Sequence, residues 1–298
     1  MRFCLVELDG RSGPTLARWS PEGLIPFDAP PSLRLALEEY GDTGLLARSA
    51  AVTAPVVPHD AVERWLPPVP DPRTFRDFYA FEQHVKTCRE RRGQAMVPAW
   101  YEMPVFYFSN PGTFRGHEEP VRRPAATSEL DFELEVACVI GRQVENATGE
   151  AAEESIFGYL VLNDLSARDL QRQEMQCMLG PAKGKDFATA AGPWVVTRDE
   201  LADARTGPGR YNLQMVARKN GRQVSRGNMN TLTFDFTQMI ARASAEVPLF
   251  PGDIIGSGTV GTGCILELGP QTTGGWLEPG DTIELEIERL GVLTTPIV

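Results

Sequence analysis

Four prolines within six residues, in the run Pro67-Pro68-Val69-Pro70-Asp71-Pro72, divide the chain into two unequal parts. Proline fixes its own φ angle and has no backbone N–H, so this run continues neither a helix nor a central strand. We therefore predict a linker here, with a small N-terminal domain over residues 1–68 and a larger domain over 69–298. The length of 298 residues, about twice that of a common single domain, fits this division.

The two parts differ in their hydrophobic patterns. A short apolar strand over residues 3–8 and helical stretches over 33–40 and 61–66 predict a small α/β leading domain. After the linker, apolar residues recur at three- and four-residue steps over 74–92, with basic residues last and Gly93 as a stop. This pattern predicts a capped amphipathic helix.

Beyond residue 120, short apolar segments alternate with turns rich in Gly, Pro and Asp. The expected strands are 132–140, 157–162, 192–196, 211–216, 253–255, 264–268 and 282–287, and the longest expected helix is 229–244. This spacing predicts a mainly β fold with short helices (α+β), largely antiparallel and rolled or sandwiched around one core.

Composition narrows the classes of partner and the cellular setting. A net charge of −11 provides no basic surface, so neither nucleic acid nor a membrane is an expected partner, and a small molecule is favoured. The five cysteines are odd in number, scattered, and without CxxC or Cys/His spacing, which argues against disulfides and against a zinc site. With no long apolar segment and no signal-peptide core, we expect a protein of the reducing cytoplasm.

The segment Leu130-Asp131-Phe132-Glu133-Leu134-Glu135-Val136 places acidic and apolar residues at alternate positions. In a strand this alternation puts the three carboxylates on one face. Carboxylates that close repel one another unless water or a cation compensates. One interpretation is a solvated outer face of an edge strand, and the other is a metal site.

A second acidic position ends the apolar segment 157–164, at Asn163-Asp164. Ser166 and Asp169 follow with the spacing of a capping box, which predicts a helix start there. Asp164 could satisfy backbone N–H groups of that helix, or it could join Glu133 and Glu135 as a metal ligand. Such an all-oxygen set suits Mg²⁺, Mn²⁺ or Ca²⁺ and does not suit zinc or copper.

These motifs, in their order, resemble the fumarylacetoacetate hydrolase family over roughly residues 70–290. The resemblance rests on the Glu-Leu-Glu strand, on GYLVLNDLSARDLQ, and on a Gly/Lys loop that ends at Lys185 and leads to Gly-Pro-Trp-Val-Val. It implies a β-roll or mixed β-sandwich catalytic domain, a homodimer, and a cation held by Glu133, Glu135 and Asp164. The upstream segment RDFYAFEQH is similar to that of fumarylacetoacetases, which implies that Asp77 is a further ligand.

The same resemblance implies roles for other residues. His84 takes the place of the catalytic base, and Glu267, in a segment similar to the family's Gly-Thr turn and following strand, takes that of its orienting carboxylate. The further implied residues are Lys185 and Gln171 as oxyanion donors and Tyr79, Tyr107 and Thr259 as substrate contacts. The chain departs from the family pattern at Met175, where a tyrosine is expected, and in its carboxylate-binding arginine, for which Arg89, Arg91 and Arg92 are candidates.

The residue pattern by itself supports some of these roles, independently of the family resemblance. Asp77 and His84 are seven positions apart, so on one helix they would share a face and address one site. A lone histidine on a helix is otherwise a surface or packed residue, and Lys185 could be a solvated loop lysine. Glu267 lies between two leucines, where an unpaired charge is costly, so a cationic partner such as His84 is expected.

We hypothesise a divalent-metal-dependent hydrolase that cleaves a carbon–carbon bond in a β-diketo acid of the fumarylacetoacetate or acylpyruvate type. In this hypothesis His84, oriented by Glu267, activates water, and Lys185 and Gln171 stabilise the oxyanion. A decarboxylase, isomerase or tautomerase acting on a 2-oxo acid is the alternative within the family. A metal-binding or ligand-binding protein without turnover is the alternative outside it.

Overall fold

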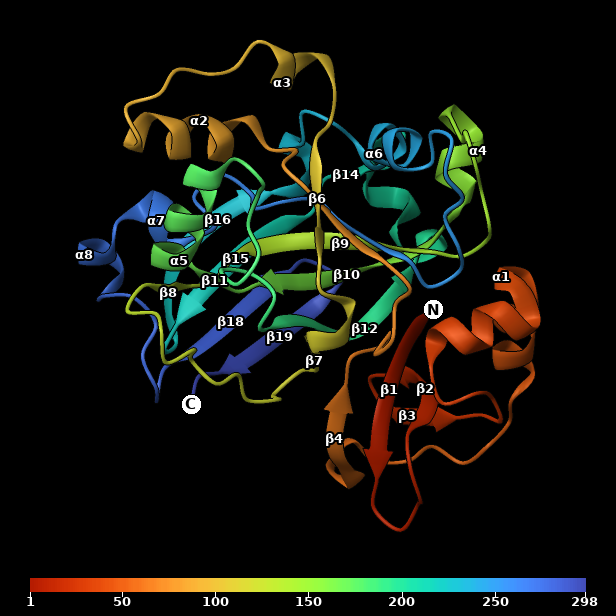
Figure 1. Ribbon diagram of the computed structural model, residues 1–298. Coiled ribbons are helices and arrows are strands. Elements are labelled where there is room, and N and C mark those ends of the chain that lie inside the picture. The colour runs from red at the N-terminus through yellow and green to blue at the C-terminus, as the bar shows by residue number, and fades with distance from the viewer.

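The computed structural model describes all residues, 1–298. Its largest sheet contains β1 (Arg2–Leu8), β2 (Thr15–Ser20), β3 (Gly23–Pro26), β4 (Val62–Leu66), β5 (Phe75–Phe78), β6 (Phe106–Ser109), β7 (Phe114–Arg115), β9 (Leu134–Ile140), β10 (Ile156–Asp164), β12 (Thr189–Thr197) and β17 (Ile254–Gly256). Their order is β3-β2-β1-β12-β10-β9-β17-β5-β6, with β4 pairing with β1 and β7 with β12 (Figure 1). The sheet is mostly antiparallel, because only the β17–β5 and β12–β7 pairs are parallel.

A second, four-stranded sheet covers the first. It has the order β16-β15-β18-β19 and consists of β15 (Gln214–Lys219), β16 (Arg222–Asn228), β18 (Thr282–Ile287) and β19 (Gly291–Pro296). Two short ribbons pair β8 (Leu130–Asp131) with β11 (Ser166–Ala167) and β13 (Arg205–Gly207) with β14 (Arg210–Tyr211). Side chains of both sheets, such as Tyr159, Val161, Met215 and Leu285, share one buried core. The expected mainly β fold with helices, built as a sandwich around one core, is confirmed.

Helices lie at the margins of the sheets (Figure 1). They are α1 (Leu33–Ala51), α2 (Glu82–Arg91), α3 (Ala99–Glu102), α4 (Gly149–Glu154), α5 (Arg168–Glu174), α6 (Phe236–Ala243), α7 (Ile265–Leu268) and α8 (Pro270–Thr273). Short 3₁₀ turns lie at His59–Ala61, Pro111–Thr113, Met175–Cys177, Arg198–Ala204 and Met229–Thr231. No helix is both long and apolar enough to cross a membrane.

Three predicted elements have a different secondary structure. Residues 61–66 form no helix; Val62–Leu66 is strand β4, because this β-branched and aromatic segment pairs with β1, Trp65 opposite Val6. The segment 74–92 begins as strand β5, buried on both faces, and becomes helical only at Glu82. Residues 264–268 contain helix α7 instead of a strand.

The N-terminal strands continue the main sheet. Strand β1 pairs with β12, Phe3 opposite Val195, and also with β2 and β4. The side chain of Phe3 packs in one buried cluster with Phe75 and Leu160 of the following part of the chain. The red and orange N-terminal segment in Figure 1 thus shares both a sheet and a core with the remainder. The domain boundary at residues 68 and 69 stays a prediction.

The central strands bring distant acidic residues to one end of the sheet. Asp77 at the end of β5 pairs with Gly256 of β17, and Gly256 pairs in turn with Ala137 of β9. In the neighbouring pairs, Glu135 lies opposite Leu162, and Asp164 at the end of β10 lies opposite Thr189. The register of five adjacent strands therefore sets where these carboxylates meet.

Candidate active site

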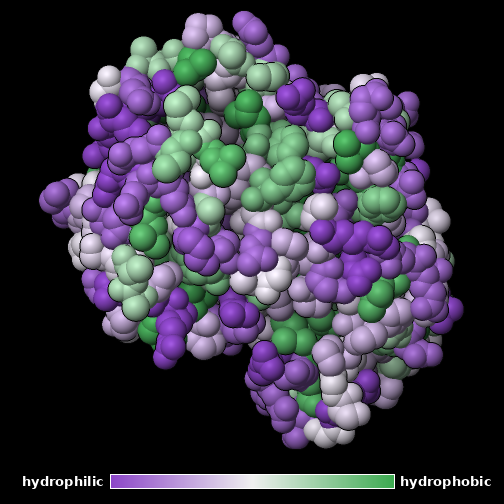
Figure 2. All heavy atoms as spheres, viewed as in Figure 1, coloured by the Kyte–Doolittle hydropathy of each residue, from purple (hydrophilic) through white to green (hydrophobic).

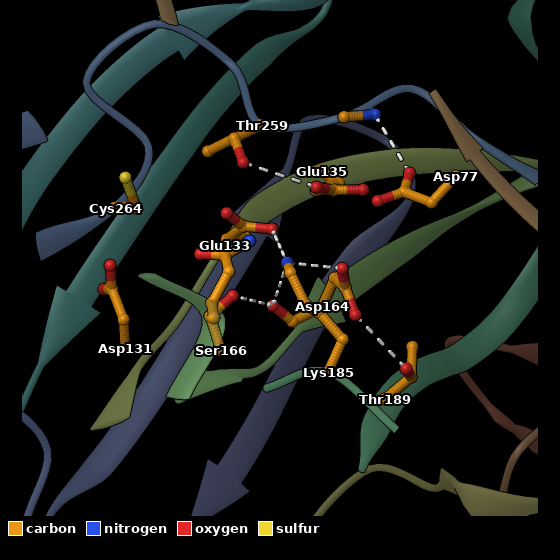
Figure 3. A network of polar contacts seen from close by, with 12 residues as sticks. Asp77, Asp131, Glu133, Glu135, Asp164, Ser166, Lys185, Thr189, Thr259 and Cys264 are labelled. Carbon is orange, nitrogen blue, oxygen red and sulfur yellow. Dashed lines mark hydrogen bonds and ion pairs between the residues drawn. The ribbon is translucent and has the colours of Figure 1, made fainter. Parts of the chain in front are cut away.

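Four carboxylates meet at this end of the sheet. Asp77, Glu133, Glu135 and Asp164 each place one carboxylate oxygen within 4.8 Å of those of the others. All four residues are buried, none with more than 5% of its surface exposed. Figure 3 shows them converging from three strands and the loop before β9. A solvated outer strand face, one of the two interpretations of the Glu-Leu-Glu segment, is excluded.

Lys185 lies among these carboxylates and is buried too. Its ammonium is 2.5 Å from Glu133 Oε2 and 2.6 Å from Asp164 Oδ2 (Figure 3). Burial would raise the pKa of Glu133, but Lys185 and then Arg168 outweigh burial and lower that pKa to about 2. Burial raises the pKa of Asp164 in spite of Lys185. Lys185 is therefore a fixed positive charge of the site and not a solvated loop residue.

Asp77 and Glu135 lack such a cation. They face each other in Figure 3, and Glu135 Oε2 is buried without a hydrogen-bond partner. Burial raises the pKa of both groups well above the usual range, and the neighbouring carboxylates raise it further. A buried carboxylate oxygen without a partner is costly, and a divalent cation would remove that cost. The all-oxygen donor set fits Mg²⁺, Mn²⁺ or Ca²⁺.

Two glycines shape the space around Asp77. A Cβ on Gly256 would lie 2.3 Å from Asp77 Oδ1, so no larger residue fits there without displacing the carboxylate. Gly258 donates its backbone N–H to Asp77 Oδ1 at 3.2 Å. With φ at 75° and a Cβ position 2.4 Å from the Phe78 carbonyl oxygen, this position also requires glycine.

An imidazole–carboxylate pair lies next to the four carboxylates. His84 Nδ1 is 2.8 Å from Glu267 Oε2, and both side chains are buried. The Thr262 backbone N–H donates to the other oxygen of Glu267 at 3.0 Å. Burial alone would lower the pKa of His84, but the Glu267 charge outweighs it and raises the pKa to about 10. The imidazole therefore carries a proton at neutral pH, with Nε2 as the nitrogen not used by Glu267.

A cavity of about 290 Å³ connects these groups. Its lining includes residues expected to contact substrate or stabilise an oxyanion, namely Tyr79, Tyr107, Gln171, Met175, Lys185 and Thr259. Tyr107 donates its hydroxyl hydrogen to Asp164 Oδ2 at 2.5 Å, and the Tyr79 ring packs edge-on against His84. The apolar part of the wall includes Phe78 of β5 and Phe106 of β6. Figure 2 shows hydrophobic side chains gathered over β6 on the face viewed.

Three arginines were candidates for binding a substrate carboxylate, and the structure places them differently. Arg89 does not line this cavity, and its guanidinium donates to the Ala95 carbonyl oxygen at 2.5 Å. Arg91 donates to the Glu267 carbonyl oxygen, which fixes the helix that carries Glu267. Arg92 does line the cavity. Of the three candidates it is the one placed to meet an anionic substrate.

Arg168 is a site residue that the sequence reasoning did not identify. It is buried, with its Nε 2.8 Å from Asp131 Oδ2 and an Nη 2.7 Å from Glu133 Oε1, and it also donates to Gln171 Oε1 at 3.1 Å. The sequence did contain a signal for Arg168. Three acidic residues lie within the five positions 131–135 and need a buried cation if they are buried, and the Ser-Ala-Arg-Asp motif contains an arginine.

Asp131 and Asp169 have structural contacts. Asp131 accepts from the backbone N–H groups of Ile265 and Leu266, which holds the first turn of α7. The predicted capping box is absent: Asp169 bonds to the Thr127 hydroxyl, and the Ser166 hydroxyl donates to the Asp164 carbonyl oxygen. The helix begins at Arg168, two residues after the expected cap.

The fold and the site together define a class of protein: a two-sheet sandwich in which four buried carboxylates, suited to hold a cation, lie beside an imidazole–carboxylate pair. Residues 73–298 match the family model described as fumarylacetoacetate (FAA) hydrolase C-terminal. The chain belongs to the fumarylacetoacetate hydrolase family, a family of enzymes.

Curated relatives and solved structures agree with this assignment. The human oxaloacetate tautomerase FAHD2A, mitochondrial, is 32% identical over 272 residues, which cover 90% of this chain and 80% of that protein. The 5-carboxymethyl-2-hydroxymuconate delta-isomerase from Mycobacterium smegmatis superposes with a TM-score of 0.72 at 26% identity, covering 100% of this chain and 99% of that one. A maleylpyruvate hydrolase from Sphingobium sp. SYK-6, solved with manganese(II) and pyruvate, has a TM-score of 0.75, with 100% and 99% coverage. At 24% identity, the last supports the fold alone.

Proposed function

We propose that this protein is a divalent-cation-dependent tautomerase that interconverts the keto and enol forms of a 2-oxo dicarboxylic acid of the oxaloacetate type. Several relatives that are 30–33% identical carry the name oxaloacetate tautomerase, and the family also contains isomerases and hydrolases. The carbon–carbon bond hydrolase, our first hypothesis from the sequence, becomes the second candidate.

The observation that carries the proposal is the buried ion pair, at 2.8 Å, between Glu267 and His84, which lines the cavity. A keto–enol conversion requires a proton to move between a carbon and an oxygen of the substrate. An imidazole whose pKa is raised by Glu267 favours the protonated form and can donate its proton to the enol carbon; the enol oxygen loses its own proton to solvent, and the neutral imidazole takes up a proton from solvent to restore the starting state. Water activation would require the neutral imidazole instead.

Each polar residue of the cavity has a distinct part in this proposal. Glu267 fixes the ring through Nδ1, so that Nε2 faces the substrate carbon and carries the proton. Lys185 and Arg92 offer positive charge to the substrate oxygens, and Arg92 is the candidate partner of the second carboxylate. Tyr107 and Gln171 are hydrogen-bonding groups close enough to orient the 2-oxo group.

A cation belongs to this proposal because the chain supplies more buried negative than positive charge here. Asp77, Glu133, Glu135 and Asp164 would hold Mg²⁺, Mn²⁺ or Ca²⁺. When bound, the cation supplies positive charge that favours the binding of a dianionic 2-oxo acid and the build-up of negative charge on its oxygen.

Hydrolysis remains the second candidate because the same imidazole–carboxylate pair would activate water if the ring were neutral. A binding protein without turnover needs the carboxylates but has no use for that pair. The expected homodimer is likewise a proposal.

The test is a pair of assays on one preparation, with Mg²⁺ or Mn²⁺ and with EDTA. The first follows the loss of the ultraviolet absorbance of enol-oxaloacetate, and the second follows pyruvate release from acylpyruvates. We expect cation-dependent tautomerisation that falls by about 10²-fold or more in His84→Gln. Acylpyruvate cleavage that is cation- and His84-dependent, without tautomerisation, would establish the hydrolase instead. Tautomerisation unaffected by His84→Gln would exclude the proposed proton donor.

A further inference from the structure

Two cysteines that are distant in sequence lie beside the imidazole–carboxylate pair. Cys88 is one turn after His84 on α2, and its Sγ is 3.8 Å from Nδ1 and 3.7 Å from Nε2 of that ring. Cys264 directly precedes α7, and its Sγ is 3.5 Å from Glu267 Oε2. Atoms of His84, Cys264 and Glu267 lie within 4.8 Å of one another, and all four residues are buried.

These separations agree with the edges of a tetrahedral zinc site. With bonds of about 2.3 Å to sulfur and about 2.0 Å to nitrogen or oxygen, tetrahedral geometry places a sulfur about 3.5 Å from a nitrogen or oxygen ligand. The observed 3.8 Å between Cys88 Sγ and His84 Nδ1 and 3.5 Å between Cys264 Sγ and Glu267 Oε2 are close to that distance. For a four-ligand site, the 2.8 Å hydrogen bond between His84 Nδ1 and Glu267 would have to lengthen by about half an ångström, and Cys88, which lies outside the group of His84, Cys264 and Glu267, would have to move toward it.

The donor set also differs in chemistry from the carboxylate site. Sulfur and imidazole donors favour zinc and related soft cations, whereas four carboxylates favour magnesium and manganese. In Figure 3, Cys264 lies apart from the four carboxylates, on the loop that leads to α7. The cavity wall includes both Cys88 and His84, so an ion that enters the cavity reaches these donors directly.

We propose that His84, Cys88, Cys264 and Glu267 form a second, inhibitory cation site that binds Zn²⁺. An ion held there engages the imidazole and the carboxylate of the proton-transfer pair, so neither is free to serve the substrate. Binding releases the protons of the two thiols and any proton of His84. The link to inhibition rests on the proposed function, whereas the binding of zinc does not.

Cobalt(II) replaces zinc as a spectroscopic probe in the first experiment. Added to the full-length protein with Mg²⁺ present, it should produce the intense near-ultraviolet absorption of thiolate-to-cobalt charge transfer, which a site of four carboxylates cannot give. We expect Cys264→Ser and Cys88→Ser to reduce this absorption by at least half, and Cys177→Ser, which changes an exposed cysteine far from the pair in sequence, to leave it unchanged. Zn²⁺ should displace the cobalt.

The second experiment measures inhibition by Zn²⁺ at saturating Mg²⁺, each variant relative to its own activity. We expect the concentration for half inhibition to rise at least tenfold in Cys264→Ala, and in Cys88→Ala if the first variant does not fold. Absence of thiolate absorption in the wild-type protein would overturn the proposal, as would absorption lost only in Cys177→Ser. The cobalt spectrum is recorded without substrate. It therefore tests cation binding even if the protein shows no tautomerase activity.

Discussion

Gly256 lies directly beside Asp77 in the parallel pairing of β17 with β5, and a Cβ at Gly256 would lie 2.3 Å from Asp77 Oδ1. Gly256→Ala should therefore displace Asp77 and weaken Mn²⁺ binding by about 10- to 100-fold, as loss of support for a metal ligand commonly does. Isothermal titration calorimetry would measure the affinity. Gly207→Ala, where the added methyl meets open space, is the control. Equal affinities in all three proteins would show that Asp77 is not a ligand.

The hydrogen bond between His84 and Glu267 predicts a non-additive pair of variants. His84→Gln and Glu267→Gln should each lower kcat by about 10²- to 10⁴-fold, and the double variant should lose little more, because the two groups act as a unit. Steady-state kinetics at saturating cation measures this. His59→Gln changes a histidine that bonds to the Ser20 carbonyl oxygen and is the control. Losses that multiply in the double variant would contradict the coupling.

The raised pKa of His84 predicts a pH-dependent contribution to stability. Because Glu267 holds the folded-state pKa near 10, above its unfolded value of about 6.5, protonated His84 stabilises the fold. That contribution is fully present below about pH 6.5 and is lost as the pH rises toward 10. In EDTA, the difference in free energy of unfolding between wild type and His84→Gln should therefore shrink from about pH 6 to about pH 10. Urea denaturation would show it, and a constant difference would argue against the shift.

Arg168 should matter far more for stability than a neighbouring arginine with an equally short ion pair. Arg168→Met leaves Asp131 and Glu133 buried without this partner and should cost about 3–5 kcal/mol of unfolding free energy. Arg172→Met removes a pair of the same 2.7 Å length with Glu129, but Arg172 is exposed, so the expected cost is under about 1 kcal/mol. Similar costs for the two variants would contradict this account.

Glu135 should destabilise the cation-free protein and stabilise the protein with a bound cation. In EDTA, Glu135→Gln removes a carboxyl group whose ionised form is disfavoured by burial and by Asp77, and should raise the unfolding free energy at neutral pH. With Mn²⁺ the wild type should gain thermal stability, by about 2.7 kcal/mol at a hundredfold excess over Kd, and the variant much less. Differential scanning calorimetry would measure both effects, with the exposed Glu150→Gln as control. A variant that responds fully to Mn²⁺ would remove Glu135 from the ligand set.

The sequence allowed three of the four carboxylates to be identified because their positions obey local rules, whereas Asp77 was implied by the family resemblance. Glu133 and Glu135 alternate with apolar residues, and Asp164 ends a strand that is apolar throughout. The segment of Asp77 was assigned to a helix, since its aromatic residues recur at helical steps. That pattern arises because β5 is buried on both faces, which only the sheet reveals.

Contacts across the fold could not be predicted in the same way. The sequence shows scattered cysteines, yet α2 and α7 bring Cys88 and Cys264 to the same histidine. The helical form of α7 depends on backbone hydrogen bonds to Asp131, more than 130 residues earlier. Local periodicity contains no information about such pairs, so the buried role of Arg168 also became visible only with the fold.

The pairing of β1 with β12 has a consequence for how the protein can be divided. Residues 73–298 carry the whole family match, but a fragment cut to those limits would lose the strand that covers Val195 and Val196. Their backbone groups would then lie on an open edge, able to recruit a strand from another molecule. The same strand β12 holds Thr189 opposite Asp164 at its other end. Trimming the first residues should therefore favour self-association and loosen Asp164, a candidate ligand of the proposed cation site, although none of those residues lines the cavity.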